Sequence, residues 1–267
     1  MNEAAAYLFR YKRITDPFFD EFLKVKIKEA KAIGTIPEAV VSDMAQILAG
    51  GKRLRGALMC LGYELCRGRN KEIYKTSLFL ELFHATLLIH DDVMDKSKTR
   101  RGVPTINARH GDHMAINAGD LVFSWTLSLL FSTSLPAERL RRVAELWGSQ
   151  FSKTVYGQIL DISSIRTPSS MRYKTAEYTG VLPLLSGAIL AGEDDREKFK
   201  ALSDYGRNLG MVFQLRDDML DGTAQKDMRL INQYFEKGIG KIKSMTRNKE
   251  QQSLLTSFLE LSRRWKK

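Results

Sequence analysis

Long stretches without proline, in which apolar residues recur every three or four positions, most constrain the fold of this chain. The 267 residues include only six prolines, and neither residues 74–95 nor residues 137–164 contain one. Because proline disrupts a helix interior, these stretches leave room for long helices. Within the first stretch, Leu78, Leu82 and Ala85 begin an apolar stripe at helical spacing. We find no convincing alternation typical of strands. The sequence therefore predicts an all-α protein.

Length and composition favour one soluble domain over residues 1–267. Apolar residues make up 43% of the chain and charged residues 27%, as in ordinary globular proteins. Residues 121–135 form the most membrane-like stretch, but they are too few and too rich in serine to span a bilayer, so we expect a buried core helix there. The N-terminus shows no signal-peptide pattern, and Cys60 and Cys66 match no zinc motif. We expect a cytoplasmic protein without a membrane span.

The formal net charge of +11 raises the question of an anionic partner. Lysine and arginine are scattered along the chain, and they form no stripe interleaved with aromatic residues of the kind that binds nucleic acid. We therefore expect no nucleic-acid partner. Most of the charge is typical of a solvated surface, while a few well-placed cations suffice to bind an anionic substrate.

Two aspartate-rich segments stand out: Asp91-Asp92-Val93-Met94-Asp95 and Asp217-Asp218-Met219-Leu220-Asp221. Both read D-D-x-x-D, and on a helix the first and last aspartates lie on one face. One such segment alone is usually a solvated helix face. Here both are flanked by apolar residues, and burying carboxylates without a cation is costly. Carboxylate oxygens are ligands that Mg²⁺ prefers, together with substrate phosphates. The pair of segments predicts a magnesium-dependent diphosphate clamp.

Basic residues follow at positions suited to phosphate. Lys52 and Arg55 lie three apart at a glycine-led helix start, where backbone amides also favour anions. A solvated basic turn is the alternative interpretation. Arg100 and Arg101 come just after the first aspartate segment, so they can fold back over its ligand. A polar stripe along the preceding helix is predicted to contain Glu81, His84, Leu88, Asp91 and Asp95.

Together these motifs resemble the trans-type isoprenyl diphosphate synthases. The resemblance rests on five motifs in family order over residues 48–221: Gly51-Lys52-Arg53-Leu54-Arg55; the run from His84 to Gly102; Gly157-Gln158 with Asp161; Lys174-Thr175-Ala176; and Gln214 with the second aspartate segment. It implies a helical bundle around a deep central cavity, a homodimer, and a prenyltransferase that extends an allylic diphosphate by isopentenyl diphosphate.

The resemblance also implies roles for individual residues. Asp91, Asp92 and Asp95 would hold two Mg²⁺ ions, and Asp217, Asp218 and Asp221 a third. The allylic diphosphate would be bound by Arg100, Lys174, Thr175 and Gln214, and isopentenyl diphosphate by Lys52, Arg55, His84 and Arg101. Asp91, Asp95, Lys174 and Asp217 would be the catalytic set. Gln158 and Asp161 would contact metal-bound waters or Lys174.

Product length follows, in this family, from the side chains that precede the first aspartate segment. Thr86 and Leu87 lie five and four residues before Asp91, and the nearest aromatic residue is Phe83. With no aromatic side chain directly beneath the segment, we expect products beyond C15, with geranylgeranyl diphosphate first and Phe83 as the cavity floor.

The sequence departs from the family pattern after Asp221. Residues 222–227 replace a longer loop with a substrate lysine, for which Lys226 is the substitute, so the domain is shortened there. This leaves a second hypothesis, a weakly active or regulatory subunit of a prenyl synthase. A terpene cyclase is a third hypothesis, although Lys52, Arg55 and Arg101 provide a second diphosphate site that a cyclase does not need.

Overall fold

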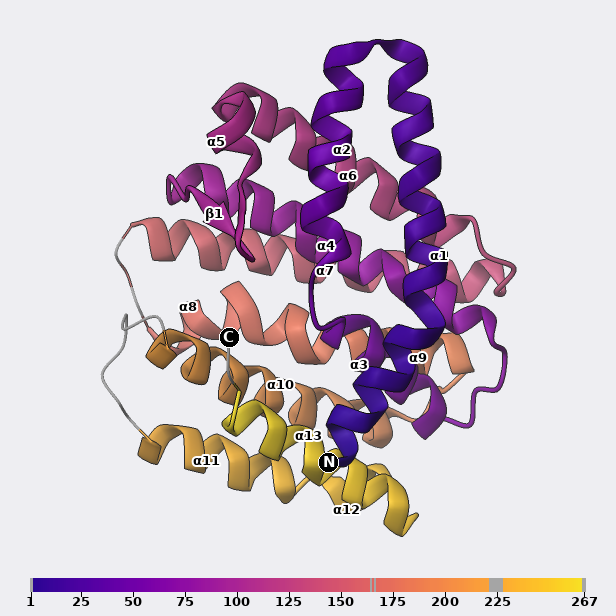
Figure 1. The fold of residues 1–267 in the computed structure, drawn as a ribbon. Helices are drawn as coiled ribbons and strands as arrows, with labels where there is room; N and C mark the ends of the chain where they lie inside the picture. The colour runs from indigo at the N-terminus through magenta and orange to yellow at the C-terminus, as the bar shows by residue number, and fades with distance from the viewer. Residues whose placement is uncertain (1, 164, 166, 221–227, 266–267) are drawn as a thin grey trace. The chain divides into compact units, whose positions relative to one another are not determined.

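The chain folds into helices along nearly its whole length, which confirms the all-α prediction (Figure 1). The computed structural model describes residues 2–163, 165, 167–220 and 228–265. The helices are α1 (Glu3–Ile33), α2 (Thr35–Ala49), α3 (Leu54–Leu65), α4 (Glu72–Met94), α5 (Ile106–His110), α6 (Asp112–Phe131), α7 (Ala137–Ile162), α8 (Pro168–Met171), the π-helix η1 (Arg172–Val181), α9 (Leu182–Ala191), α10 (Arg196–Leu220), α11 (Met228–Ile239), α12 (Ile242–Met245) and α13 (Lys249–Arg263).

The chain divides into two compact units. The first-aspartate unit comprises residues 10–56 and 74–134, and the second-aspartate unit comprises residues 1–9, 57–73 and 135–267. Each unit contains one of the two aspartate segments. That residues 1–267 act as a single domain stays a prediction.

In the first-aspartate unit, α1 and α2 form an antiparallel hairpin that turns at Gly34 (Figure 1). Phe19 of α1 and Met44 of α2 are completely buried. Phe22 of α1 meets Trp125 of α6 edge to face, with ring centroids 5.9 Å apart. Such an edge contact is a favoured aromatic geometry and adds to the area that the rings bury. Apolar side chains of α1, α2 and α6 thus contribute to the core of this unit.

A short hairpin that was not predicted from the sequence interrupts the helices of the first-aspartate unit. Strands β1 (Thr99–Arg100) and β2 (Val103–Pro104) pair antiparallel, with Arg100 opposite Val103. The two turn residues, Arg101 and Gly102, have φ of 55° and 81°, as required in the tight turns that match strand twist. Two-residue strands are too short for an alternating pattern, so periodicity could not reveal them.

In the second-aspartate unit, η1 packs against both α7 and α10. Glycines allow the close approach: a Cβ added at Gly157 of α7 would lie 2.3 Å from the Lys174 nitrogen, and one at Gly210 of α10 would lie 2.5 Å from the Ala176 oxygen. A ten-residue π-helix is rare, and π-type turns inside helices are frequent at functional sites. The close packing therefore surrounds the segment that carries Lys174.

Helix α6 is longer and more exposed than the sequence indicated. The buried helix expected over residues 121–135 is instead Asp112–Phe131, and Leu121 and Phe131 are 37% and 54% exposed. By length and composition, α6 is the one helix in the described ranges that is able to cross a membrane, and 44% of its most apolar window is buried. Only one side of α6 therefore belongs to the core.

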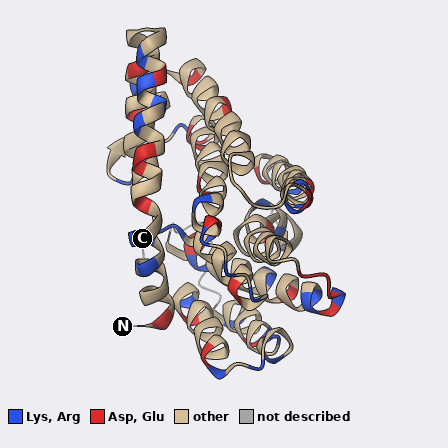
Figure 2. Cartoon of the chain, turned by 90° about the vertical axis from the view of Figure 1, so that its right-hand side faces the viewer, with Lys and Arg blue, Asp and Glu red and all other residues tan. Residues whose placement is uncertain are grey.

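Charged side chains of both signs alternate along α1 (Figure 2). Lys26 lies 2.8 Å from Glu29, and Lys31 lies 3.6 Å from Glu38. Exposed pairs of this kind contribute little to stability, but they keep a helix surface soluble. On this helix the basic residues form a mixed surface rather than a track for nucleic acid.

Candidate active site

The first aspartate segment lies at the C-terminal end of α4. The helix ends at Met94, and the Asp95 amide still donates to the Asp91 carbonyl at 2.8 Å, so the helical turn continues to Asp95. Asp91 is half-buried and Asp95 is exposed. Because they are four residues apart in one turn, these carboxylates share a face, as predicted.

Asp92 differs from Asp91 and Asp95 in its exposure, because its side chain is buried against Arg100. Its side chain accepts from Nε of Arg100 at 3.1 Å and from Nη2 at 2.5 Å. Burial opposes the charge on the guanidinium, but the bonds to Asp92 and the fields of Asp91 and Asp95 outweigh it and raise the pKa of Arg100. Arg100 therefore folds back on the first aspartate segment and pairs with Asp92, whereas its predicted role over the ligand of that segment stays a prediction.

Helix α5 holds the loop between Asp95 and Arg100. Nδ2 of Asn107 donates to the carbonyl of Asp92 at 3.2 Å and to that of Ser97 at 3.1 Å, while the Thr105 hydroxyl donates to Ser97 at 2.8 Å. These contacts fix the end of α4 and the hairpin relative to each other. Sequence reasoning missed Asn107, because its partners are backbone carbonyls that leave no pattern in the sequence.

The basic turn, residues 50–55, connects α2 to α3. Arg53 donates from Nη1 to the Leu48 carbonyl at 2.8 Å and from Nη2 to the Ala49 carbonyl at 3.1 Å, and its Nε pairs with Asp16 at 3.1 Å. These bonds satisfy carbonyls at the end of α2. Arg53 itself has φ of 55°, a left-handed conformation that costs a non-glycine residue about 1 kcal/mol or more. Arg53 is thus a structural residue between the predicted ligands Lys52 and Arg55.

Arg101 is also bound to the end of α2. Its Nη1 donates to the carbonyls of Ile47 at 2.8 Å and Gly50 at 2.5 Å. The guanidinium fills the space beside Gly51, where an added Cβ would lie 3.0 Å from Nη2. Burial has the largest effect on the pKa of Arg101 and lowers it. The charge of Glu81 raises this pKa, whereas Arg53 and the other nearby guanidinium groups lower it, and the overall shift is downward. The Arg101 side chain therefore packs against Gly50 and Gly51, the two glycines that precede the predicted helix start.

His84 lies among the cations of the first-aspartate unit. Burial lowers the pKa of His84 well below its ordinary value of 6.5, and the nearby charges of Arg55, Arg101 and Arg100 lower it further. The imidazole is therefore neutral at neutral pH. Arg55 is buried with 6% exposure, whereas Lys52 is exposed. The fold thus brings His84, Arg55, Arg100 and Arg101 into one electrostatic cluster, which we call the arginine cluster.

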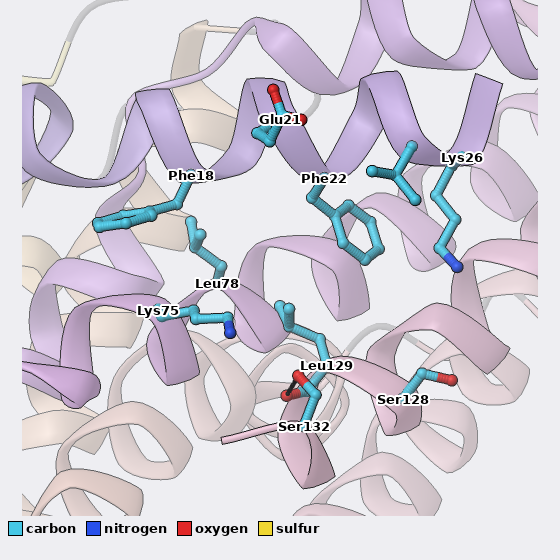
Figure 3. Close-up of a pocket in the computed structure, with 10 residues that line it drawn as sticks. Phe18, Glu21, Phe22, Lys26, Lys75, Leu78, Ser128, Leu129 and Ser132 are labelled. Atoms are coloured by element: carbon cyan, nitrogen blue, oxygen red, sulfur yellow. Dashed lines mark hydrogen bonds between the residues drawn. The ribbon is translucent and has the colours of Figure 1, made fainter. Parts of the chain in front are cut away.

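A cavity of about 400 Å³ lies in the first-aspartate unit (Figure 3). Its lining is mostly apolar, with Phe22 from α1, Leu78 from α4 and Leu129 from α6, and it also includes Lys26 and Lys75. Leu78 precedes Asp91 by thirteen residues, which is about 20 Å along the helix and about 140° around it. The cavity therefore opens on a different face of α4 from the aspartates.

In the second-aspartate unit, Lys174 of η1 forms an ion pair with Asp161 of α7, with Nζ 2.6 Å from Oδ2. Of the two contacts expected for Asp161, the one with Lys174 is therefore confirmed. Thr175 is buried with 7% exposure, and Gln158 is half-buried on the same helix as Asp161. The ion pair fixes the direction of the Lys174 ammonium.

Gln214, Asp217 and Asp218 lie on α10 and are half-buried. Nε2 of Gln214 donates to Oδ1 of Asp218 at 2.5 Å, one helical turn away. Asp221 and Lys226 lie outside the described residues. Gln214, Asp217 and Asp218 therefore lie within two turns of a single helix.

A buried carboxylate that sequence reasoning missed joins η1 to α10. Glu177 is 2% exposed, and it accepts from Nε of Arg172 at 2.6 Å and from Nε of Arg207 at 2.9 Å. Although burial raises it, the pKa of Glu177 is lowered overall by these two guanidinium groups. Two arginines around one buried carboxylate are a structural connection, and their separation in sequence hid it.

The carboxylates present suit a hard divalent cation. In the described ranges no three acidic, histidine or cysteine side chains converge as a complete metal site. Mg²⁺ needs only one or two carboxylates when substrate phosphates and water supply its other ligands. Asp91 with Asp95, and Asp217 with Asp218, each provide part of the oxygen ligands of such an ion. These residues therefore fit magnesium that is bound together with a diphosphate.

Comparison with known proteins gives consistent results. The sequence profile of polyprenyl synthetases matches residues 38–231. The chain is 34% identical over 221 residues to a geranylgeranyl diphosphate synthase of Methanosarcina mazei, covering 80% of this chain and 65% of that protein. It is 29% identical over 225 residues to one of Sulfolobus acidocaldarius, covering 79% and 67%. The chain thus spans about two thirds of the length of these relatives.

Among solved structures, the fold is similar to a geranylgeranyl pyrophosphate synthase from Corynebacterium glutamicum complexed with isoprenyl diphosphate and magnesium. The TM-score is 0.85, with 22% sequence identity, and the match covers 95% of this chain and 98% of that one. At this identity the likeness concerns the fold.

Proposed function

Because this chain belongs to the polyprenyl synthetase family, we propose that it is a magnesium-dependent prenyltransferase that condenses isopentenyl diphosphate with an allylic diphosphate. The observation that carries the proposal is the arginine cluster. The charges of Arg55, Arg100 and Arg101 act on the neutral His84, which lies on the helix that presents Asp91 and Asp95. A surplus of guanidinium charge beside a carboxylate pair suits one diphosphate bound directly and a second bound through metal.

Isopentenyl diphosphate would be bound by Lys52, Arg55, His84 and Arg101. The neutral imidazole of His84 donates one hydrogen bond without adding charge, and Arg55 presents the planar fork that suits phosphate oxygens. Since Arg101 already bonds to carbonyls at the end of α2, its guanidinium is oriented before substrate arrives. Such preorganisation reduces the cost of ordering side chains on binding.

The allylic diphosphate would be bound by Arg100, Lys174, Thr175 and Gln214 together with magnesium. Asp91, Asp92 and Asp95 would hold two ions and Asp217, Asp218 and Asp221 a third. We expect Asp92 to reach a metal only through a rearrangement, because its oxygens accept from Arg100.

The reaction needs little from the protein besides electrostatics. The allylic C–O bond breaks, the diphosphate leaves with both electrons, and the double bond of isopentenyl diphosphate attacks the resulting cation. A proton is then lost, with the departed diphosphate as base in the family mechanism. Magnesium, when bound, stabilises the charge on the leaving group. Positive side chains that bind a leaving group lower the barrier most, because the negative charge develops there; this is the role that Arg100 and Lys174 would each have.

We propose products longer than C15, with geranylgeranyl diphosphate first. Thr86, five residues before Asp91, is 2% exposed, and its hydroxyl donates to the Leu82 carbonyl. A small, internally bonded side chain at this position leaves room beneath the first aspartate segment. Phe83 is completely buried, which suits a cavity floor. Relatives named as geranylgeranyl and geranylfarnesyl diphosphate synthases support this range.

We also propose a homodimer through α6. Its exposed apolar side chains include Ile116 at 46%, Leu127 at 36% and Phe131 at 54%. Exposed apolar side chains along one helix are typical of an interface, and a second copy is the commonest partner. Sedimentation of the chain with Phe131→Lys, beside the unchanged protein, tests this assignment. A cytoplasmic location stays a prediction.

One assay tests the activity. Purified protein is incubated with Mg²⁺, labelled isopentenyl diphosphate and allylic primers of increasing length, and products are separated by chromatography. We expect extension that stops on chelation of the metal and in Asp91→Asn. No extension with any primer rejects the enzyme. Extension only after a homologous synthase is added instead supports the regulatory subunit.

A further inference from the structure

Glu81 is a buried carboxylate that the proposed chemistry does not use. It lies in α4, three residues before His84, and is 7% exposed. A buried carboxylate is costly unless hydrogen bonds or opposite charges compensate for lost water. Its partners therefore indicate why an acid is present here.

The carboxylate bonds to the backbone of the neighbouring helix. Oε1 of Glu81 accepts from the Gly56 amide at 2.8 Å. Gly56 is in the first turn of α3, together with Arg55. The first amides of a helix have no partner within the helix, so an external oxygen satisfies one of them, as a capping side chain does. Because the acceptor is charged, this bond is stronger than a neutral one.

Gly56 is also closely packed, so a larger residue would displace the Tyr11 side chain. An added Cβ would lie 2.0 Å from the hydroxyl of Tyr11 and 3.2 Å from the Ser77 carbonyl. The Tyr11 hydroxyl is 2.7 Å from the Ser77 hydroxyl. Side chains of α1 and α4 therefore meet at the first turn of α3, and Glu81 joins this turn to α4.

The charge of Glu81 is placed among guanidinium groups. Arg53 pairs with Asp16 and Arg100 with Asp92. Glu81 is within electrostatic range of Arg101 and opposes the loss of its charge. A negative group here keeps the cations together before an anionic substrate arrives, and it remains tied to the Gly56 amide afterwards.

We propose that Glu81 is a positioning residue of the isopentenyl diphosphate site. Its carboxylate fixes the first turn of α3, which carries Arg55, against α4, which carries His84. This inference rests on the proposed function. Glu81 would keep Arg55 and His84 at a fixed distance from each other in that site. Glu81 touches neither substrate nor metal in this account.

Three substitutions separate the hydrogen bond from the charge. Glu81→Gln keeps an oxygen acceptor at the same reach without charge, Glu81→Asp keeps the charge but withdraws the oxygen, and Glu81→Leu removes both. We expect KM for isopentenyl diphosphate to rise roughly tenfold or more in the Asp and Leu variants, as for loss of a charge-assisted bond. In Gln it should change less, and KM for the allylic substrate should stay near its original value in all three.

Binding of inorganic pyrophosphate without divalent cations, measured by calorimetry, gives a second readout. Affinity should fall in Glu81→Asp and persist in Glu81→Gln, while Glu145→Leu, on the exposed surface of α7, serves as the matched control. Equal rises in both KM values, a Gln variant as impaired as Leu, or an Asp variant like the original protein overturns the proposal. If the unchanged chain transfers no prenyl group, the proposed function fails, yet pyrophosphate binding still decides the role of Glu81.

Discussion

Gly180→Ala tests the packing of the π-helix against α10. A Cβ at Gly180 would lie 2.0 Å from the carbonyl oxygen of Gly206, whereas ordinary contact begins at 3.4 Å. The difference, 3.4 − 2.0 = 1.4 Å, must come from backbone movement, because the obstructing atom belongs to the main chain. The substitution therefore forces η1 and α10 apart.

The expected cost follows from two opposing effects. Overpacking costs up to about 3 kcal/mol when the neighbour cannot rotate away. Alanine regains about 1 kcal/mol over glycine in a helix. The net loss is about 2 kcal/mol, which lowers Tm by roughly 4–8 °C in a chain of this size.

Thermal unfolding followed by circular dichroism measures the effect, with Gly148→Ala as the matched control. Gly148 lies in α7 with nothing within 4 Å of an added Cβ, so this variant should be as stable as the original protein or more stable. Activity should also fall in Gly180→Ala, because Lys174 of η1 moves relative to Gln214 of α10. A Gly180→Ala variant that melts no lower than Gly148→Ala would refute the close approach.

The remaining predictions concern single side chains of the site. The folded pKa of His84 is lowered below 6.5, so the unfolded chain binds a proton first as pH falls. The stability from neutral His84 is complete above about pH 6.5 and is lost below it, and Tm between pH 7 and 5 should fall less in His84→Gln than in the original protein. Phe83→Ala should lengthen the products, whereas Leu82→Ala, in the apolar stripe, should lower Tm without lengthening them; unchanged product length in Phe83→Ala rejects the floor assignment. Asp161→Asn should raise KM for the allylic substrate, and a double-mutant cycle with Lys174→Met should give a coupling of about 0.5–3 kcal/mol, against additivity if the 2.6 Å pair is unimportant.

Local spacing in the sequence determined the helices and much of the site. The pairing of Asp91 with Asp95 and the order of Gln214, Asp217 and Asp218 follow from residues one turn apart on a single helix. Such geometry needs no knowledge of other elements. The roles in substrate and metal binding came from the resemblance, and the site experiments above test them.

Only the tertiary structure shows which side chains of the site are exposed and which are bonded to other parts of the protein. Asp92 belongs to the same motif as Asp91, yet it is buried against Arg100, and Arg101 bonds to carbonyls of α2. The sequence predicted Glu81 in a polar stripe but assigned it no role. The structure shows that its carboxylate accepts a hydrogen bond from the Gly56 amide. The contacts of Arg101 and Glu81 join residues far apart in sequence through backbone atoms, which every residue shares, so no pattern of side chains could have predicted these two.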